Sequence, residues 1–160
     1  MSVAFLREDS AETAQEVALP ERAISPYPNF VTEAGLRALE RAEAEARAAL
    51  EAAQQIEDAN ERRRAVEHAQ RDFRYFGERL RTAEVKAAPA SHDVVAFGAE
   101  VTIHRDDERR QTFRIVGEDE AEPREGSISY VSPLARAILG KGVGDRVSVG
   151  GREIEILAIR

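Results

Sequence analysis

The stretch QQIEDANERRRAV, Gln54–Val66, separates two segments that each carry a helical repeat of apolar residues. In both segments apolar side chains recur at alternating spacings of three and four. The positions are Leu39, Ala42, Ala46, Ala49, Ala53 and Ile56 in the first segment, and Val66, Ala69, Phe73, Phe76, Leu80 and Ala83 in the second. Such spacing predicts two helices packed along one seam, and a short connection makes neighbouring helices antiparallel. The sequence therefore predicts an antiparallel coiled-coil hairpin with QIEDANERRR at its tip.

The segment before the hairpin shows no sustained apolar period and carries Pro20, Pro26 and Pro28. Proline fixes φ and restricts the residue before it, so we expect an extended N-terminal arm over residues 1–30. Thr32 is placed as the N-cap of the first helix, with Glu33 in the first turn. The hairpin is then expected over residues 31–86. A linker with proline and small residues, 87–92, leads into a second domain over residues 93–160.

In the second domain the apolar period changes to two, which predicts β-strands. We expect strands at residues 100–105, 111–116, 127–130, 145–149 and 152–159, with Gly150-Gly151 as a hairpin turn between the last two. The run PLARAILG after Ser132 predicts a short helix, with serine as N-cap and proline at its first position. The acids in GEDEAEP, 117–123, are expected in a loop. The fold class is therefore α+β, a coiled-coil hairpin followed by a small antiparallel β domain with one short helix.

The composition excludes several classes of function. The chain of 160 residues has 30 Asp and Glu against 23 Lys and Arg, and a net charge of -7 disfavours simple electrostatic binding to duplex DNA. Cysteine is absent, which excludes disulfides and cysteine-based zinc sites, and the three histidines lack the spacing of metal ligands. No apolar run is long enough to cross a bilayer and no secretory signal begins the sequence. We therefore expect a cytoplasmic protein without membrane contact.

Several blocks between Phe97 and Val149 carry a family likeness, namely FGAEVT, TFRIVGEDEA, ISYVSPLARAILGK and GDRVSV. They resemble the C-terminal domain of the Gre-family (GreA/GreB-like) bacterial transcription elongation and transcript cleavage factors. VTEAGLRALE, Val31–Glu40, and ERLRTAEV, Glu78–Val85, are similar to the ends of that family's helical hairpin. The resemblance implies an FKBP-like C-terminal domain and one partner, bacterial RNA polymerase, bound at its secondary channel.

The resemblance also implies roles for particular residues. Ser132, Pro133, Ala135 and Arg136 match the segment with which the family binds polymerase. Asp58 and Glu61 have the spacing of the family's acidic pair at the tip, which assists the Mg²⁺ bound in the polymerase. Carboxylates suit that ion, which prefers oxygen ligands. The chain would then be no enzyme itself but a monomer that binds no cofactor alone, stimulates hydrolysis by the polymerase and meets the RNA transcript end only indirectly.

Other readings stay open at the tip. By residue type alone, Asp58 and Glu61 are solvated turn residues. Glu57 stands where the family has glycine, and Arg62, Arg63 and Arg64 replace its asparagine, alanine and glutamate. These arginines either contact RNA or the channel wall or form a solvated helix start. Matching the helix ends also implies about seven residues fewer per helix than in the cleavage factors, or roughly 10 Å less reach. The alternative is therefore a regulator that occupies the channel and competes with cleavage factors without stimulating cleavage. A third hypothesis is a structural coiled-coil protein that self-associates.

Overall fold

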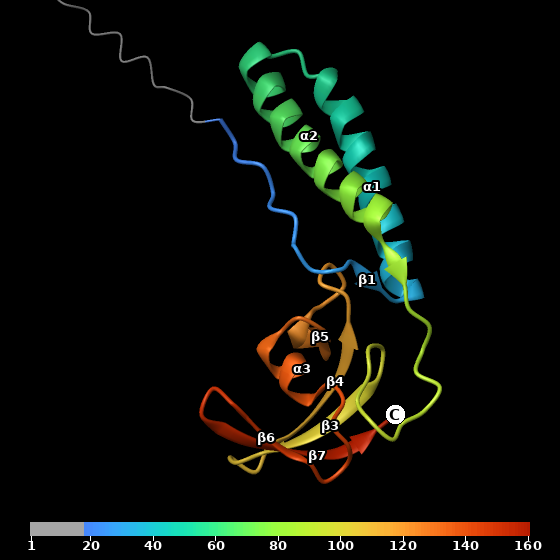
Figure 1. Cartoon of the computed structure of the whole chain (residues 1–160). Helices are drawn as coiled ribbons and strands as arrows, with labels where there is room; N and C mark the ends of the chain where they lie inside the picture. Colours follow the sequence, from blue (N-terminus) through green and yellow to red (C-terminus); the bar gives the residue numbers. More distant parts are fainter. Residues whose placement is uncertain (1–17) are drawn as a thin grey trace, which may run out of the picture.

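Two long helices form a rod that stands on a β-rich domain (Figure 1). The computed structural model describes residues 18–160, so residues 1–17 of the predicted arm lie outside the described part. Helix α1 spans Glu33–Gln54 and helix α2 spans Ala59–Thr82. The helices run antiparallel and pack over most of their length. The predicted hairpin is confirmed, and the fold class is α+β as the sequence indicated.

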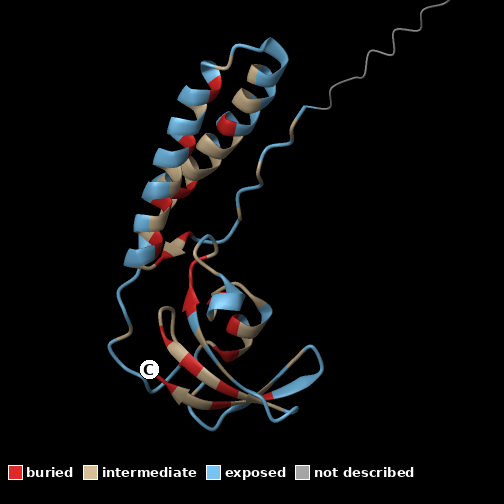
Figure 2. Ribbon diagram, turned by 180° about the vertical axis from the view of Figure 1, so that it is seen from behind, coloured by how far each residue is buried: buried red, intermediate tan, exposed pale blue. Residues whose placement is uncertain are grey.

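The helix interface uses small side chains from α1, as the heptad spacing predicts. The buried residues of the two helices are Gly35, Leu39, Ala46 and Ala53 from α1 and Ala69 and Arg79 from α2. Figure 2 shows buried positions, in red, on both helices of the rod. Alanine lets two helices approach closely without leaving voids. Ala49 departs from the predicted seam, since it is exposed, and so does Ala83, which is the C-cap of α2.

A two-stranded parallel sheet that the sequence did not indicate closes the base of the rod. Strand β1, Phe30–Val31, pairs with strand β2, Glu84–Val85. The residues just before α1 are thereby tied to those just after α2. Each strand has only two residues, too few for an apolar alternation to appear in the sequence.

The C-terminal domain is built on a five-stranded sheet of order β5-β4-β3-β7-β6. The strands are β3 Glu100–Arg105, β4 Arg110–Val116, β5 Ser127–Ser129, β6 Arg146–Val149 and β7 Arg152–Ile159, with helix α3, Pro133–Ile138, and the 3₁₀ helix η1, Pro123–Glu125, between strands. Helix α3 packs against the sheet near β6 (Figure 1). The core consists of Val95, Ala99, Val101, Ile103, Ile115, Ile128, Ala135, Ile138, Ile154, Ile156 and Ile159. Val101 and Ile103 in β3 and Ile154 and Ile156 in β7 follow the predicted period of two, whereas Ile159 comes three residues after Ile156, beside a register shift in the β3–β7 pairing.

Two details of the sheet have clear physical reasons. Gly150 and Gly151 have φ of 59° and 77° in the β6–β7 turn, the positive values that a tight hairpin turn requires, so the predicted hairpin is confirmed. The prediction of a purely antiparallel sheet is wrong at β5, which pairs parallel to β4. Residues 117–126 make a crossover through the acidic loop and η1 instead of a hairpin, and only such a connection brings a strand back in the same direction.

Candidate functional site

The tip of the rod is a tight turn of four residues, 55–58, between α1 and α2. Asp58 is the N-cap of α2, and its Oδ1 accepts a hydrogen bond of 2.7 Å from the backbone N–H of Glu61. An aspartate cap offers a helix an acceptor for one of its free N–H groups and typically contributes about 1 kcal/mol. Glu61 lies in the first turn of α2, where the helix dipole favours an acid.

Asp58 and Glu61 are both exposed at this end of the rod. One oxygen of Asp58 is engaged by the cap, which leaves its second oxygen and the Glu61 carboxylate open to a partner. No group of three or more acids and histidines that could hold a metal occurs among residues 18–160. Two carboxylates alone suit a role as additional ligands to an ion that another molecule already holds. That role stays a prediction.

The predicted extent of the tip needs a correction, because residues 59–64 are helical. Arg62 closes the turn, since its Nη1 donates to the carbonyl oxygens of Ile56 at 2.8 Å and Glu57 at 3.2 Å. This guanidinium neutralises the carbonyl end of α1. Arg63 and Arg64 lie on the exposed side of the first turns of α2. For these two, the predicted contact with RNA or a channel wall stays a prediction.

At the other end of the rod, Arg79 joins α2 to the acidic loop of the C-terminal domain. Its side chain is only 2% exposed, and its Nε lies 2.5 Å from Asp119 Oδ2, while its Nη2 lies 3.7 Å from Glu118 Oε2. Tyr75 donates its hydroxyl to the other oxygen of Asp119 at 2.5 Å, and Asn29 Nδ2 donates to the Arg79 carbonyl at 2.7 Å. A buried charge is tolerated only when paired in this way.

The same loop also reaches the start of α1. Thr32, the N-cap, accepts from the N–H of Gly35 at 2.9 Å and donates its own hydroxyl to Glu120 at 2.7–2.8 Å. Gly117 has no room for a side chain, because a Cβ there would collide with the Phe30 carbonyl oxygen. We call Glu118, Asp119 and Glu120 the acidic clamp. It fastens the base of both helices to the sheet domain.

Sequence reasoning found Thr32 as a cap but missed the acidic clamp and its partner Arg79. The sequence predicts only a loop for the three successive acids that follow a buried strand. The available signal was that such a cluster needs cations or hydrogen-bond donors, and the seam of α2 brings an arginine beside Phe76 and Leu80. Which arginine it would be depended on how the rod sits on the domain.

Tyr75 gives the acidic clamp a measurable property. Burial, reinforced by the hydrogen bond to Asp119 and by that carboxylate's charge, raises the pKa of Tyr75 to about 12 from its ordinary 10.0. A raised pKa in the folded state stabilises the fold fully below about pH 10, and this contribution disappears as the pH rises towards about 12. We expect the free energy of unfolding to fall over that range, and to fall less in Tyr75→Phe. Urea unfolding at about pH 9 and about pH 11 measures the difference, and equal pH dependence in both proteins would contradict it.

Helix α3 holds the residues predicted to bind polymerase. Ser132 is its N-cap, with Oγ 3.3 Å from the N–H of Ala135, and Pro133 occupies the first turn, as predicted. Pro133 and Arg136 are exposed. Ala135 is 0% exposed and lies in the core beneath α3, so it offers no surface to a partner in this structure, and the predicted role of this segment in binding polymerase stays a prediction. The residue packs α3 onto the sheet, because small side chains at a helix–sheet contact allow close approach.

The fold and these sites define a class of protein in which a rigid helical rod with an acidic tip stands on an α+β domain. Residues 90–160 match the family described as "Transcription elongation factor, GreA/GreB, C-term". The match covers the C-terminal part of the chain and confirms the resemblance seen in its sequence.

Similar proteins include transcription elongation factors GreA from two Methylobacterium species. That of Methylobacterium sp. (strain 4-46) is 52% identical over 71 residues, which cover 41% of this chain and 45% of the relative. That of Methylobacterium nodulans is 46% identical over 84 residues, covering 49% and 53%. The chain therefore spans about half the length of the curated relatives it matches.

Among solved structures, GreA factor homolog 1 (Gfh1) of Thermus thermophilus is similar with 23% identity and a TM-score of 0.40, covering 84% of this chain and 99% of that one. The GreA/GreB factor from Nitrosomonas europaea has 15% identity and a TM-score of 0.38, covering 83% and 98%. Within residues 18–160, no helix has the length and apolar character that a membrane span needs.

Proposed function

We propose that this chain is a Gre-like transcription elongation factor that binds bacterial RNA polymerase at its secondary channel and stimulates the polymerase's own transcript cleavage. One observation carries the proposal. A C-terminal domain of the GreA/GreB family bears a rod whose far end exposes Asp58 and Glu61. The curated relatives matched by that domain are named transcription elongation factors.

The tip supports the proposal through its chemistry. In phosphoryl transfer a second divalent ion lowers the charge at the attacked phosphate and activates water. Asp58 and Glu61 would offer carboxylate oxygens to the Mg²⁺ of the polymerase, and the cap hydrogen bond holds Asp58 in place at 2.7 Å. The chain itself would hydrolyse nothing, and it would meet the RNA end only through the polymerase.

The rest of the molecule would position this tip. Helix α3, through Ser132, Pro133 and Arg136, would bind the rim of the channel. The Arg79 pairing with the acidic clamp would keep the rod at a fixed angle, because a buried ion pair with several hydrogen bonds allows few alternative arrangements. Arg63 and Arg64 would face RNA phosphate or the channel wall.

The second candidate is a regulator that occupies the channel and competes with cleavage factors without stimulating cleavage. The length of the rod favours it. With 22 residues, α1 reaches about 33 Å at 1.5 Å per residue. A carboxylate that stops several ångströms short of an ion cannot be its ligand.

Backtracked elongation complexes decide between the two functions. Polymerase stalled on a labelled transcript is incubated with the chain, and the shortened RNA is followed by gel electrophoresis. Cleavage faster than in polymerase alone supports the proposal. Binding without faster cleavage, combined with displacement of a cleavage factor, supports the competitor. Absence of binding contradicts both.

A further inference from the structure

The N-terminal arm is seated along the rod, although its residues lie outside the sequence resemblance. We define the arm here as residues 21–30, ERAISPYPNF. On its outer part, Arg22 pairs with Asp72 at 3.1 Å and its guanidinium carbon lies 3.8 Å from the centre of the Tyr75 ring. Glu21 forms an ion pair with Arg74 of α2. These contacts fix the arm against the same helix that carries the Arg79 pairing.

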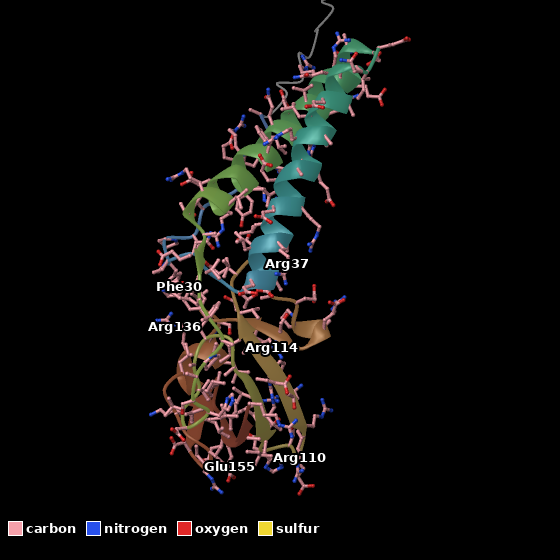
Figure 3. The ribbon with its side chains drawn as sticks, turned by 90° about the vertical axis from the view of Figure 1, so that its right-hand side faces the viewer. Phe30, Arg37, Arg110, Arg114, Arg136 and Glu155 are labelled. Carbon is pink, nitrogen blue, oxygen red and sulfur yellow. The ribbon has the colours of Figure 1, made fainter. Side chains whose placement is uncertain are left out.

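The inner part of the arm is seated on the C-terminal domain. The Tyr130 hydroxyl donates to the Pro28 carbonyl, and the Phe30 ring packs against Tyr130 with 5.3 Å between ring centroids. Arg136 of α3 reaches the arm, because its Nη1 lies 3.4 Å from the Tyr27 hydroxyl. Figure 3 shows Phe30 and Arg136 on the same side of the junction between rod and domain. The arm thus ends beside the helix predicted to bind polymerase.

Although it is anchored at both ends, the arm leaves its middle side chains exposed. Ile24 is 43% and Tyr27 44% exposed, and Pro26 and Pro28 are exposed as well. Between the arm and the end of α2 lies a depression of about 360 Å³, lined by Ile24, Ser25, Pro26, Tyr27, Pro28, Asn29, Arg79, Thr82 and Glu84. Ordering an arm costs conformational entropy, and apolar side chains that stay exposed bury too little surface within the chain to offset that cost. Such exposed aromatic and apolar residues beside a cation are typical of an interface.

The charges beside the arm indicate what would cover it. Arg22, Arg74 and Arg79 each have a carboxylate partner. Arg136 has no carboxylate partner within the part of the chain that the structure describes, and only the Tyr27 side chain accompanies it. Arginine at an interface commonly binds a carboxylate of the partner. The surface therefore suits a protein segment that offers an acid together with an apolar side chain.

We propose that the arm and α3 form one binding surface for RNA polymerase, made by Ile24, Tyr27, Pro133 and Arg136. This inference rests on the proposed function. A polymerase segment would place a carboxylate on Arg136 and an apolar side chain in the depression beside Ile24. The arm would then be part of the docking site, and the surface would be wider than α3 alone.

Binding of the full chain to core RNA polymerase, measured by biolayer interferometry, tests the surface. We expect the double variant Ile24→Ala/Tyr27→Ala to raise the Kd at least about tenfold, as truncation of central apolar anchors does. The matched control is Val94→Ala/Val143→Ala, two exposed apolar residues of the C-terminal domain outside the surface, 47% and 60% exposed. We expect the control to keep the wild-type Kd.

Hydroxyl-radical footprinting of the wild-type chain separates direct contact from a bracing role. Ile24 and Tyr27 should become protected when polymerase binds, whatever the stability of the variants. Wild-type binding with unchanged affinity of the double variant overturns the inference alone, and so does a loss of affinity without protection of these residues. A wild-type chain that does not bind polymerase overturns the proposed function instead, together with what rests on it.

Discussion

The double variant Asp58→Asn/Glu61→Gln should lose at least about 10- to 100-fold of the cleavage rate that the wild-type chain adds in backtracked complexes. Losses of this size are typical when groups that support a metal site are changed. Asparagine caps a helix about as well as aspartate, so the turn that holds the tip is preserved while both negative charges are removed. The amide oxygens that remain are poorer ligands for a divalent cation. The measurement is the rate of RNA shortening at saturating factor.

A matched control removes the same charge nearby. Glu57→Gln/Glu67→Gln changes two exposed acids, one in the turn and one in α2, without touching the cap. This control variant should stimulate transcript cleavage by the polymerase at the wild-type rate. If both double variants lose activity equally, the effect is one of overall charge, and the specific role of Asp58 and Glu61 is wrong. If wild type and all variants bind without cleavage, the chain is a competitor.

Arg79→Met should lower the free energy of unfolding by about 3 kcal/mol, because removing one member of a buried pair leaves the other charge without compensation. The side chains of Asp119 and Glu118 are only 14% and 23% exposed, so water replaces the lost guanidinium poorly. The free energy of unfolding of Arg79→Lys should lie between those of the wild type and Arg79→Met. Lysine keeps the positive charge but lacks the planar guanidinium that donates two parallel hydrogen bonds. Urea unfolding followed by circular dichroism measures the change, and urea leaves the ion pairs unscreened.

Two further variants test whether the loss of stability in Arg79→Met comes from the broken buried ion pair. Arg81→Met removes an arginine two positions on that pairs with Glu78 at the surface, where it is 71% exposed, and it should leave the urea midpoint unchanged. Adding Glu118→Gln/Asp119→Asn to Arg79→Met should restore part of the lost stability, because the stranded charges are then gone. An unchanged midpoint in Arg79→Met would show that the acidic clamp does not hold the rod.

The helical hairpin and the longer strands could be predicted because their apolar patterns repeat over many residues. The seam from Leu39 to Leu80 and the alternation in β3, β4 and β7 each place apolar residues on one face over several turns or residues. The two-glycine turn and the Ser132-Pro133 cap are local geometries that few residue types satisfy. The predictions failed where few residues carry the structure. β1 and β2 are two residues long, and β5 turns parallel through an irregular loop.

The candidate site divides in the same way. Asp58 and Glu61 could be found because their spacing and their place between two helices are local, and Asp58 caps α2 through a bond within three residues. Arg79, by contrast, meets Asp119 forty positions away, and Tyr27 meets Arg136 across 109 positions. Ala135 matches the family's binding segment in sequence, but the packing of α3 on the sheet buries its side chain in the core.

The sequence by itself determined the rod, its acidic tip and the α+β domain beneath it, because apolar periodicity and local capping act over a few residues. Only the tertiary structure decided how these parts are joined. It placed a buried arginine in the acidic clamp and laid the arm beside α3, since pairing of distant charges depends on where the packed elements meet. That junction sets the direction in which the rod carries Asp58 and Glu61.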